Sequence, residues 1–245
     1  MPLRSAPLPR MAGQLSFMRA QTKAICDVRP GDLAVLGVPF EDTSAPYAGQ
    51  SLAPRALRET SVYFGWHANP QFSHPVDIDA RQHIQTDGLH ERLCDLGDIS
   101  PERDKTIHTA LRAAASQISR NGACAVILGG SDQLSETVKS ALPKCQTVQL
   151  GGMPRDARDF HIAPLPNGSA RICKSNTAAQ LTRFSQWRDA SKPLFVRFDL
   201  SVFETSLSAL CDRPRLGGCD LDTVAQWLSA LGQHEVSAIM LTGLN

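Results

Sequence analysis

The 245-residue sequence contains no C-x-x-C pair, no long apolar run and no excess of charge of either sign. Lys and Arg number 25 and Asp and Glu number 24, and no run of basic residues forms a stripe. This balance argues against a surface that binds nucleic acid or a membrane. No apolar stretch approaches the length that crosses a bilayer, so we expect neither a nucleic acid nor a membrane among the partners.

Cysteine is present, but not in the patterns that bind zinc or build a disulfide framework. The seven cysteines are odd in number, and several lie inside apolar runs such as "ACAVIL". They are typical of buried, reduced thiols in a cytosolic protein. The first 26 residues carry no acid, yet three prolines interrupt any amphipathic helix and no apolar signal core is present. We therefore expect a cytoplasmic protein.

Short apolar runs alternate with longer helical patterns along the chain. The runs predict strands over 33–38, 94–98, 124–128, 147–150, 193–200 and 236–242. Apolar spacing predicts helices over about 54–62, from a Ser100 cap to about 120, from about 133 onward, and over about 221–231. The segment between 150 and 193 is predicted to be rich in loops. This alternation indicates an α/β fold with a mostly parallel sheet, whose site lies at the carboxyl ends of the strands.

Five ordered blocks resemble the arginase/agmatinase (ureohydrolase) superfamily, and its agmatinase-like branch most of all. They are "GVPF" with the helix start after it, "DLGDI", "ILGGSD", "FVRFDLSVFETS", and the last helix followed by "VSAIMLTGLN". The resemblance implies a three-layer α-β-α arginase-like fold with a mostly parallel central sheet. It implies an N-terminal extension over 1–27 and one ureohydrolase-like domain over 28–245, shortened between 155 and 199 and at the C-terminus.

The resemblance also indicates where the six manganese ligands of the family would fall. In that family two Mn²⁺ ions share a water and activate it to attack a guanidinium carbon. The six positions fall on Asp132, Gly151, Met153, Arg155, Asp199 and Ser201. Only Asp199 is retained as the family has it, and the substrate-binding Glu of the family falls on Gly243. Because an arginine cannot coordinate a cation, Arg155 would repel Mn²⁺, so we expect no metal cofactor.

The carboxylates of this pocket also have structural interpretations. Asp132 follows a Gly-Gly turn, where it is a good cap for the next helix. Asp199 can form a structural salt bridge with Arg155 or Arg197, and Arg155 could equally neutralise Asp132. We therefore predict a vestigial pocket without catalytic residues.

Other residues near the blocks are weaker candidates. The segment 156–159 is a second, poorer match to the D-A-H-x-D ligand set of the family. His161 is the only histidine between 155 and 199, and it is predicted to lie at the surface or in a loop. Glu41-Asp42 is predicted to belong to an ordinary turn. Arg55 and Arg58, at the helix start that resembles the family's, are predicted to serve packing and subunit contacts.

These observations predict a ureohydrolase-like pseudoenzyme that has lost the binuclear manganese site and guanidino-hydrolase activity. Such a protein would act as an oligomer subunit or a regulator, in a trimer or hexamer of its own or with an active ureohydrolase paralogue. Two alternatives stay open. One is a metal-free enzyme or small-ligand-binding protein in which Arg155 holds a carboxylate or phosphate. The other is an active agmatinase-type hydrolase of C–N bonds in amidines.

Overall fold

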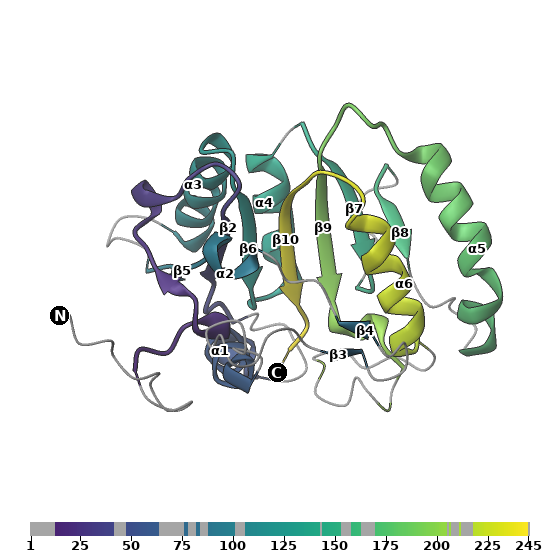
Figure 1. The fold of residues 1–245 in the computed structure, drawn as a ribbon, viewed down its shortest axis with the longest axis horizontal. Helices are drawn as coiled ribbons and strands as arrows, with labels where there is room; N and C mark the ends of the chain where they lie inside the picture. The colour runs from purple at the N-terminus through teal and green to yellow at the C-terminus, as the bar shows by residue number, and fades with distance from the viewer. Residues whose placement is uncertain are drawn as a thin grey trace.

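An eight-stranded sheet forms the centre of the chain in a computed structural model (Figure 1). The structure describes residues 13–41, 48–63, 76–77, 82–83, 88–100, 106–142, 144–152, 158–162, 170–204, 206, 211 and 218–244. The strand order is β1-β5-β2-β6-β10-β9-β7-β8, and every neighbouring pair runs parallel. The prediction of an α/β fold with a parallel sheet is therefore confirmed.

The strands are short and mostly apolar, because a parallel sheet is covered on both faces. In chain order they are β1 (Gln21–Thr22), β2 (Leu33–Gly37), β5 (Leu93–Asp98), β6 (Cys124–Leu128), β7 (Gln146–Leu150), β8 (Phe160–Ile162), β9 (Leu194–Asp199) and β10 (Val236–Thr242). A separate antiparallel pair is formed by β3 (Val76–Asp77) and β4 (Gln82–His83). All six predicted strands are present, and β1 adds a residue pair from the N-terminal segment to the edge of the sheet.

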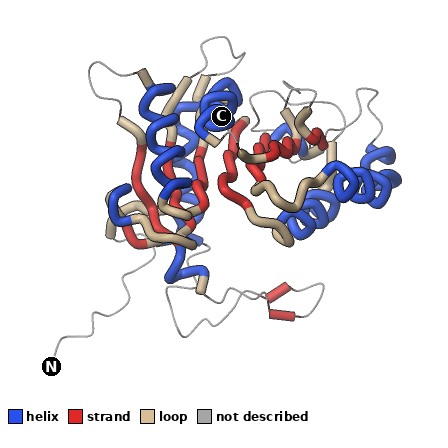
Figure 2. The backbone as a smooth tube through the Cα atoms, turned by 90° about the horizontal axis from the view of Figure 1, so that it is seen from above, coloured by secondary structure: helices blue, strands red, loops and turns tan. Residues whose placement is uncertain are grey.

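Helices cover both faces of the sheet (Figure 2). They are α1 (Ala53–Ser61), α2 (Leu89–Arg92), α3 (Ile107–Arg120), α4 (Ser135–Ala141), α5 (Ala170–Trp187) and α6 (Leu221–Leu231). Short 3₁₀ turns are η1 (Phe17–Arg19), η2 (Ile25–Asp27), η3 (Gln50–Leu52), η5 (Asp132–Leu134) and η6 (Leu200–Val202). Within the described ranges, none of the helices combines the length and apolar character that crossing a bilayer requires.

Alternating residues of β9 show how the layers are built. Phe195 packs into the core cluster beneath α3 and α4, which also contains Leu111 and Val138. Its neighbours Leu194 and Val196 belong to a second cluster on the opposite face, beneath α5 and α6. Because successive side chains of a strand point to opposite faces, these two helix pairs lie on opposite sides of the sheet. The core is thus three layers thick.

Two helix predictions were wrong. The helix α3 is capped by Thr106, whose hydroxyl accepts from the N–H of Thr109 at 3.3 Å, and not by Ser100. The segment between 150 and 193 contains β8 and the 18-residue helix α5, where loops were predicted. Helix α5 could not be predicted from the spacing of its apolar residues, because it has no continuous apolar stripe. Among its described side chains, Phe184 packs its ring edge-on against Phe160 and Trp227.

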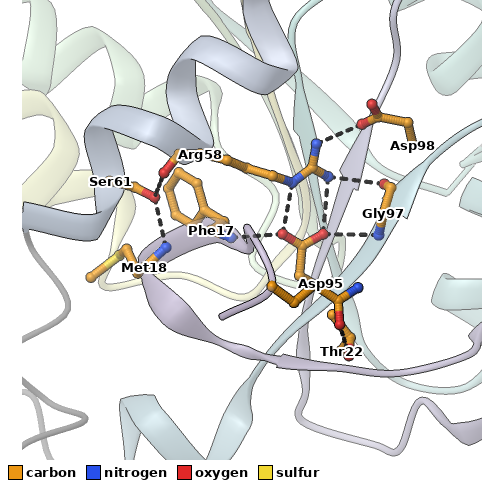
Figure 3. Close-up of polar contacts among 9 residues, drawn as sticks. Phe17, Met18, Thr22, Arg58, Ser61, Asp95, Gly97 and Asp98 are labelled. Atoms are coloured by element: carbon orange, nitrogen blue, oxygen red, sulfur yellow. Dashed lines mark hydrogen bonds and ion pairs between the residues drawn. The ribbon is translucent and has the colours of Figure 1, made fainter. Parts of the chain in front are cut away.

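The buried Arg58 of α1 joins three segments that are distant in sequence (Figure 3). Its Nε and Nη2 donate to the two carboxylate oxygens of Asp95 on β5 at 2.8 and 2.9 Å. Asp95 Oδ2 also accepts from the N–H of Phe17, and Ser61 Oγ accepts from the N–H of Met18, both at 2.7 Å. Arg58 is 5% exposed and Asp95 is 1% exposed, so this is a buried, charge-assisted clamp. It fixes the N-terminal segment to the sheet.

Candidate functional site

The carboxyl ends of β6, β10, β9 and β7 bring together the predicted pocket residues that the structure describes. These strands are neighbours in the sheet and end at one edge (Figure 1). Five predicted residues lie in or directly after them, namely Asp132, Gly151, Asp199, Ser201 and Gly243. Met153 and Arg155 lie outside the described residues, and so do Asp156 and Ala157 of the alternative segment 156–159. The structure therefore places these five of the predicted pocket residues.

Asp199 is a buried carboxylate that connects neighbouring strand ends. Its Oδ1 accepts from the N–H of Ser201 at 2.9 Å, and its Oδ2 accepts from the hydroxyl of Thr242 at 3.0 Å. Ser201 Oγ in turn accepts from the N–H of Gly152 at 2.9 Å. The one carboxylate that the sequence retains from the ligand set thus has donors on both oxygens. Its role in this structure is to fasten β7, β9 and β10 at their ends.

Neither Gly151 nor Gly243 has room for a side chain. A Cβ on Gly151 would lie 2.6 Å from the backbone O of Asp199 and 2.6 Å from the backbone N of Val202. A Cβ on Gly243 would lie 2.9 Å from Asp199 Oδ1. Both glycines have left-handed φ values, +72° and +83°, which L side chains rarely adopt. The positions that correspond to a ligand Asp and to the substrate-binding Glu of the resembled family are therefore closed by packing.

Asp132 is neutralised by Arg197, a buried arginine of β9. Arg197 Nη2 donates to Asp132 Oδ1 at 2.7 Å, and the two side chains are 3% and 19% exposed. The guanidinium extends towards α4, where Nη1 lies 3.7 Å from Glu136 Oε1 and 4.0 Å from Asp159 Oδ2. The predicted pairing of Arg197 with Asp199 was wrong, because the guanidinium extends across to η5 and α4 and not along its own strand. In the sequence, an arginine inside an otherwise apolar strand is the feature that indicates a buried acidic partner.

Ser131, and not Asp132, caps the helical segment after β6. Its Oγ accepts from the N–H of Gln133 at 3.2 Å, and Asp132 is already the first residue of η5. The predicted capping role of Asp132 was therefore wrong. Gly129 and Gly130 both have φ near +75°, and this tight turn places the serine hydroxyl over the first free N–H groups. The carboxylate of Asp132 does not cap the helix and is paired with Arg197 instead.

His161 lies half-buried on the edge strand β8, so of the two predicted placements, at the surface or in a loop, the loop was wrong. Its Nε2 lies 3.1 Å from the backbone O of Gly151, which also accepts from Gln149 Nε2 at 2.8 Å. Both side chains thus hold the turn that follows β7. This strand was missed because three residues give no usable period.

Glu41 anchors the loop after β2 to the start of the first helix. Its carboxylate accepts from the N–H groups of Ser51 and Gly49, at 3.0 and 2.9 Å. These backbone hydrogen bonds, led by that of Ser51, lower the pKa of Glu41 below its usual range. Glu41 therefore belongs to the structural turn that the sequence predicted, while Asp42 lies outside the described residues.

The described residues at the strand ends do not by themselves supply the ligands of a binuclear manganese centre. Hard divalent ions require several carboxylate and imidazole ligands that converge on one point. Here Asp199 is engaged by backbone and hydroxyl donors, and Asp132 is paired with a guanidinium. In the part of the chain that the structure describes, no three His, Cys, Asp or Glu residues gather closely enough to hold an ion. Arg197 supplies a fixed cation to the Asp132 carboxylate.

Comparison with known proteins confirms the resemblance to the arginase family, whose model matches residues 31–151. A hypothetical agmatinase from Burkholderia thailandensis is similar at 18% identity and a TM-score of 0.73, over 96% of this chain and 83% of that one. The proclavaminate amidino hydrolase from Streptomyces clavuligerus is similar at 16% identity and 0.73, over 97% and 90%. Trypanosoma cruzi formiminoglutamase with Mn²⁺ is similar at 14% identity and 0.62, over 92% and 91%. The chain therefore has the arginase-like α/β fold.

Proposed function

We propose that this chain is a ureohydrolase-like pseudoenzyme, which keeps the arginase-like fold without the binuclear manganese site or guanidino hydrolysis. The observation that carries the proposal is the closed packing of the strand ends. Gly151 and Gly243 occupy two family positions that need carboxylates, and a Cβ at either would overlap Asp199 or its neighbours. Restoring the family residues would require the backbone to move, so the loss involves the shape of the site as well as its side chains.

The electrostatics of the site support the same proposal. Hydrolysis of a guanidinium by this family requires an activated hydroxide between two metal ions. The buried guanidinium of Arg197 pairs with Asp132, so the negative charge of that carboxylate is already compensated and attracts neither a metal cation nor a cationic substrate. The alternative of a small-ligand site in the old pocket is weakened by the same contacts, because Asp132 and Asp199 are already engaged inside the protein.

A pseudoenzyme of this fold acts, in this proposal, as a subunit or regulator. The partner is a second copy of the chain, in a trimer or hexamer, or an active ureohydrolase paralogue. The support is the resemblance to a family that assembles in this way. Light scattering coupled to size-exclusion chromatography measures the mass directly, and a monomer at micromolar concentration that also fails to join a paralogue would contradict this part of the proposal.

Activity measurements test the loss of hydrolysis. The purified protein is incubated with Mn²⁺ and with agmatine, arginine, guanidinobutyrate or formimidoylglutamate, and urea or formamide release is followed beside an active agmatinase as positive control. We expect no release above that of a heat-denatured sample. Saturable turnover of any one substrate would overturn the proposal, and its loss in an Asp199→Ala variant would place that turnover at the strand ends.

A further inference from the structure

A large groove lies beside α4, and Glu136 and Asp159, which lie near Arg197, belong to its lining. Its volume is about 1270 Å³, and it extends from Glu136 of α4 and Leu142, directly after that helix, to the amino ends of β7 and β10. We propose that this groove binds an extended acidic segment of a partner protein. The proposal goes beyond the lost hydrolase site, because none of the predicted pocket residues that the structure describes lines the groove. It concerns what the retained fold can still bind.

The wall of the groove contains a buried polar group that has no partner in the described residues. Thr147 of β7 is 3% exposed, and its Oγ1 makes no hydrogen bond within the described part of the chain. Val148 and Leu150 belong to the core beneath α5 and α6, so the alternation of the strand directs Thr147 to the opposite face, towards α4. A buried hydroxyl without a partner is unfavourable. A backbone carbonyl or carboxylate of a bound segment would satisfy it.

The groove carries an excess of positive charge. Five basic side chains line it against three acidic ones. Asp159 accepts from Lys139 at 2.7 Å, and Glu136 lies 3.7 Å from Arg197, which is itself paired with Asp132. Glu136 and Glu235 are therefore set against four basic residues of the rim, Arg120, Lys144, Arg158 and Lys192, of which Lys192 lies 3.2 Å from Asp189 Oδ2.

The distribution of this charge favours an extended ligand over a compact anion. The four rim residues come from four separate connections: the end of α3, the α4–β7 turn, the segment before β8 and the α5–β9 turn. Tight binding of a phosphate or carboxylate needs donors that converge on one point. The volume also exceeds the roughly 300–1,000 Å³ of small-molecule pockets. Apolar wall residues, Leu142 and Trp187 among them, can anchor side chains interspersed between acidic ones.

Fluorescence anisotropy of the full chain tests this proposal. The probe is a fluorescein-labelled peptide of glutamates with interspersed leucines, and its glutamine counterpart is the neutral control. The groove variant is Lys144→Glu with Lys192→Glu. The matched control is Arg112→Glu with Arg183→Glu, two exposed arginines outside the groove whose reversal changes the net charge equally. We expect saturable, salt-sensitive binding that falls about tenfold in the groove variant and less than about twofold in the control.

Three results would overturn the proposal. They are no saturable binding, equal weakening by the two double variants, and displacement of the peptide by micromolar phosphate or citrate, which would assign the groove to a small anion. Circular dichroism confirms that each variant is folded. None of these results bears on the absence of guanidino hydrolysis, so failure here leaves the pseudoenzyme proposal standing.

Discussion

Alanine at Gly243 should destabilise the protein more than alanine at Gly31. Both glycines have φ of +83°, so the strain of a Cβ on left-handed backbone, about 1–2 kcal/mol, is common to the two variants and cancels. Nothing lies within 4 Å of a Cβ added at Gly31, whereas one added at Gly243 meets Asp199 Oδ1 at 2.9 Å. Because overpacking of a buried site costs about 1–3 kcal/mol, the two variants should differ by about that amount.

Urea unfolding, followed by tryptophan fluorescence, measures the difference as a change in the free energy of unfolding at a constant denaturant slope. The buried Trp227 reports on the sheet half that contains the site. Equal losses of stability at Gly243 and Gly31 would refute the reasoning. There would then be space for a side chain at position 243, and the site could accommodate the carboxylate that guanidinium binding in the family requires.

Three further outcomes follow from other contacts. Arg58→Ala should lower the free energy of unfolding by about 3–5 kcal/mol, because it leaves Asp95 buried without its partner. Arg55→Ala removes an exposed i,i+4 pair and should lower it by less than about 0.5 kcal/mol. Similar losses for the two variants in urea unfolding would contradict this. Although burial opposes it, a lysine and a backbone N–H lower the pKa of Asp32. The stabilising effect of its carboxylate is therefore complete above its unfolded pKa near 3.8 and is lost as the pH falls through the folded pKa. The free energies of unfolding of the protein and of Asp32→Asn should converge in acid, and a constant difference between the two as the pH falls would contradict this. Burial raises the pKa of the Cys124 thiol to about 11, so alkylation of the native protein at pH 8, mapped by mass spectrometry, should spare it until the protein unfolds.

The sheet could be predicted from the sequence because its central strands are continuous apolar runs. The predicted 124–128 and 236–242 have the same bounds as β6 and β10. Elements that depend on tertiary contacts were not predictable in this way. The helix α5 is held by a few aromatic contacts without an apolar stripe, and β8 is defined only by its pairing with β7. The start of α3 depends on a cap geometry that several hydroxyls upstream could have supplied.

At the site, too, the sequence indicates which residues lie at the strand ends, whereas the contacts of their side chains depend on the folded geometry. Asp132, Gly151, Asp199 and Gly243, which the family register assigned to the pocket, lie at neighbouring strand ends, because parallel strands end at one edge. It could not show that Asp199 would occupy the space next to Gly243. The choice of Arg197 as partner of Asp132, across two strands and 65 residues, likewise depends on side-chain direction in the folded sheet.

Manganese binding measures the central claim most directly. The protein is treated with chelator, titrated with Mn²⁺ in a calorimeter, then desalted and analysed for metal by mass spectrometry, with an active agmatinase treated in parallel. We predict no saturable heat at micromolar Mn²⁺ and far less than one ion retained per chain, because Arg197 supplies the positive charge and Gly151 supplies no ligand. Two tightly held Mn²⁺ ions per chain would contradict the account.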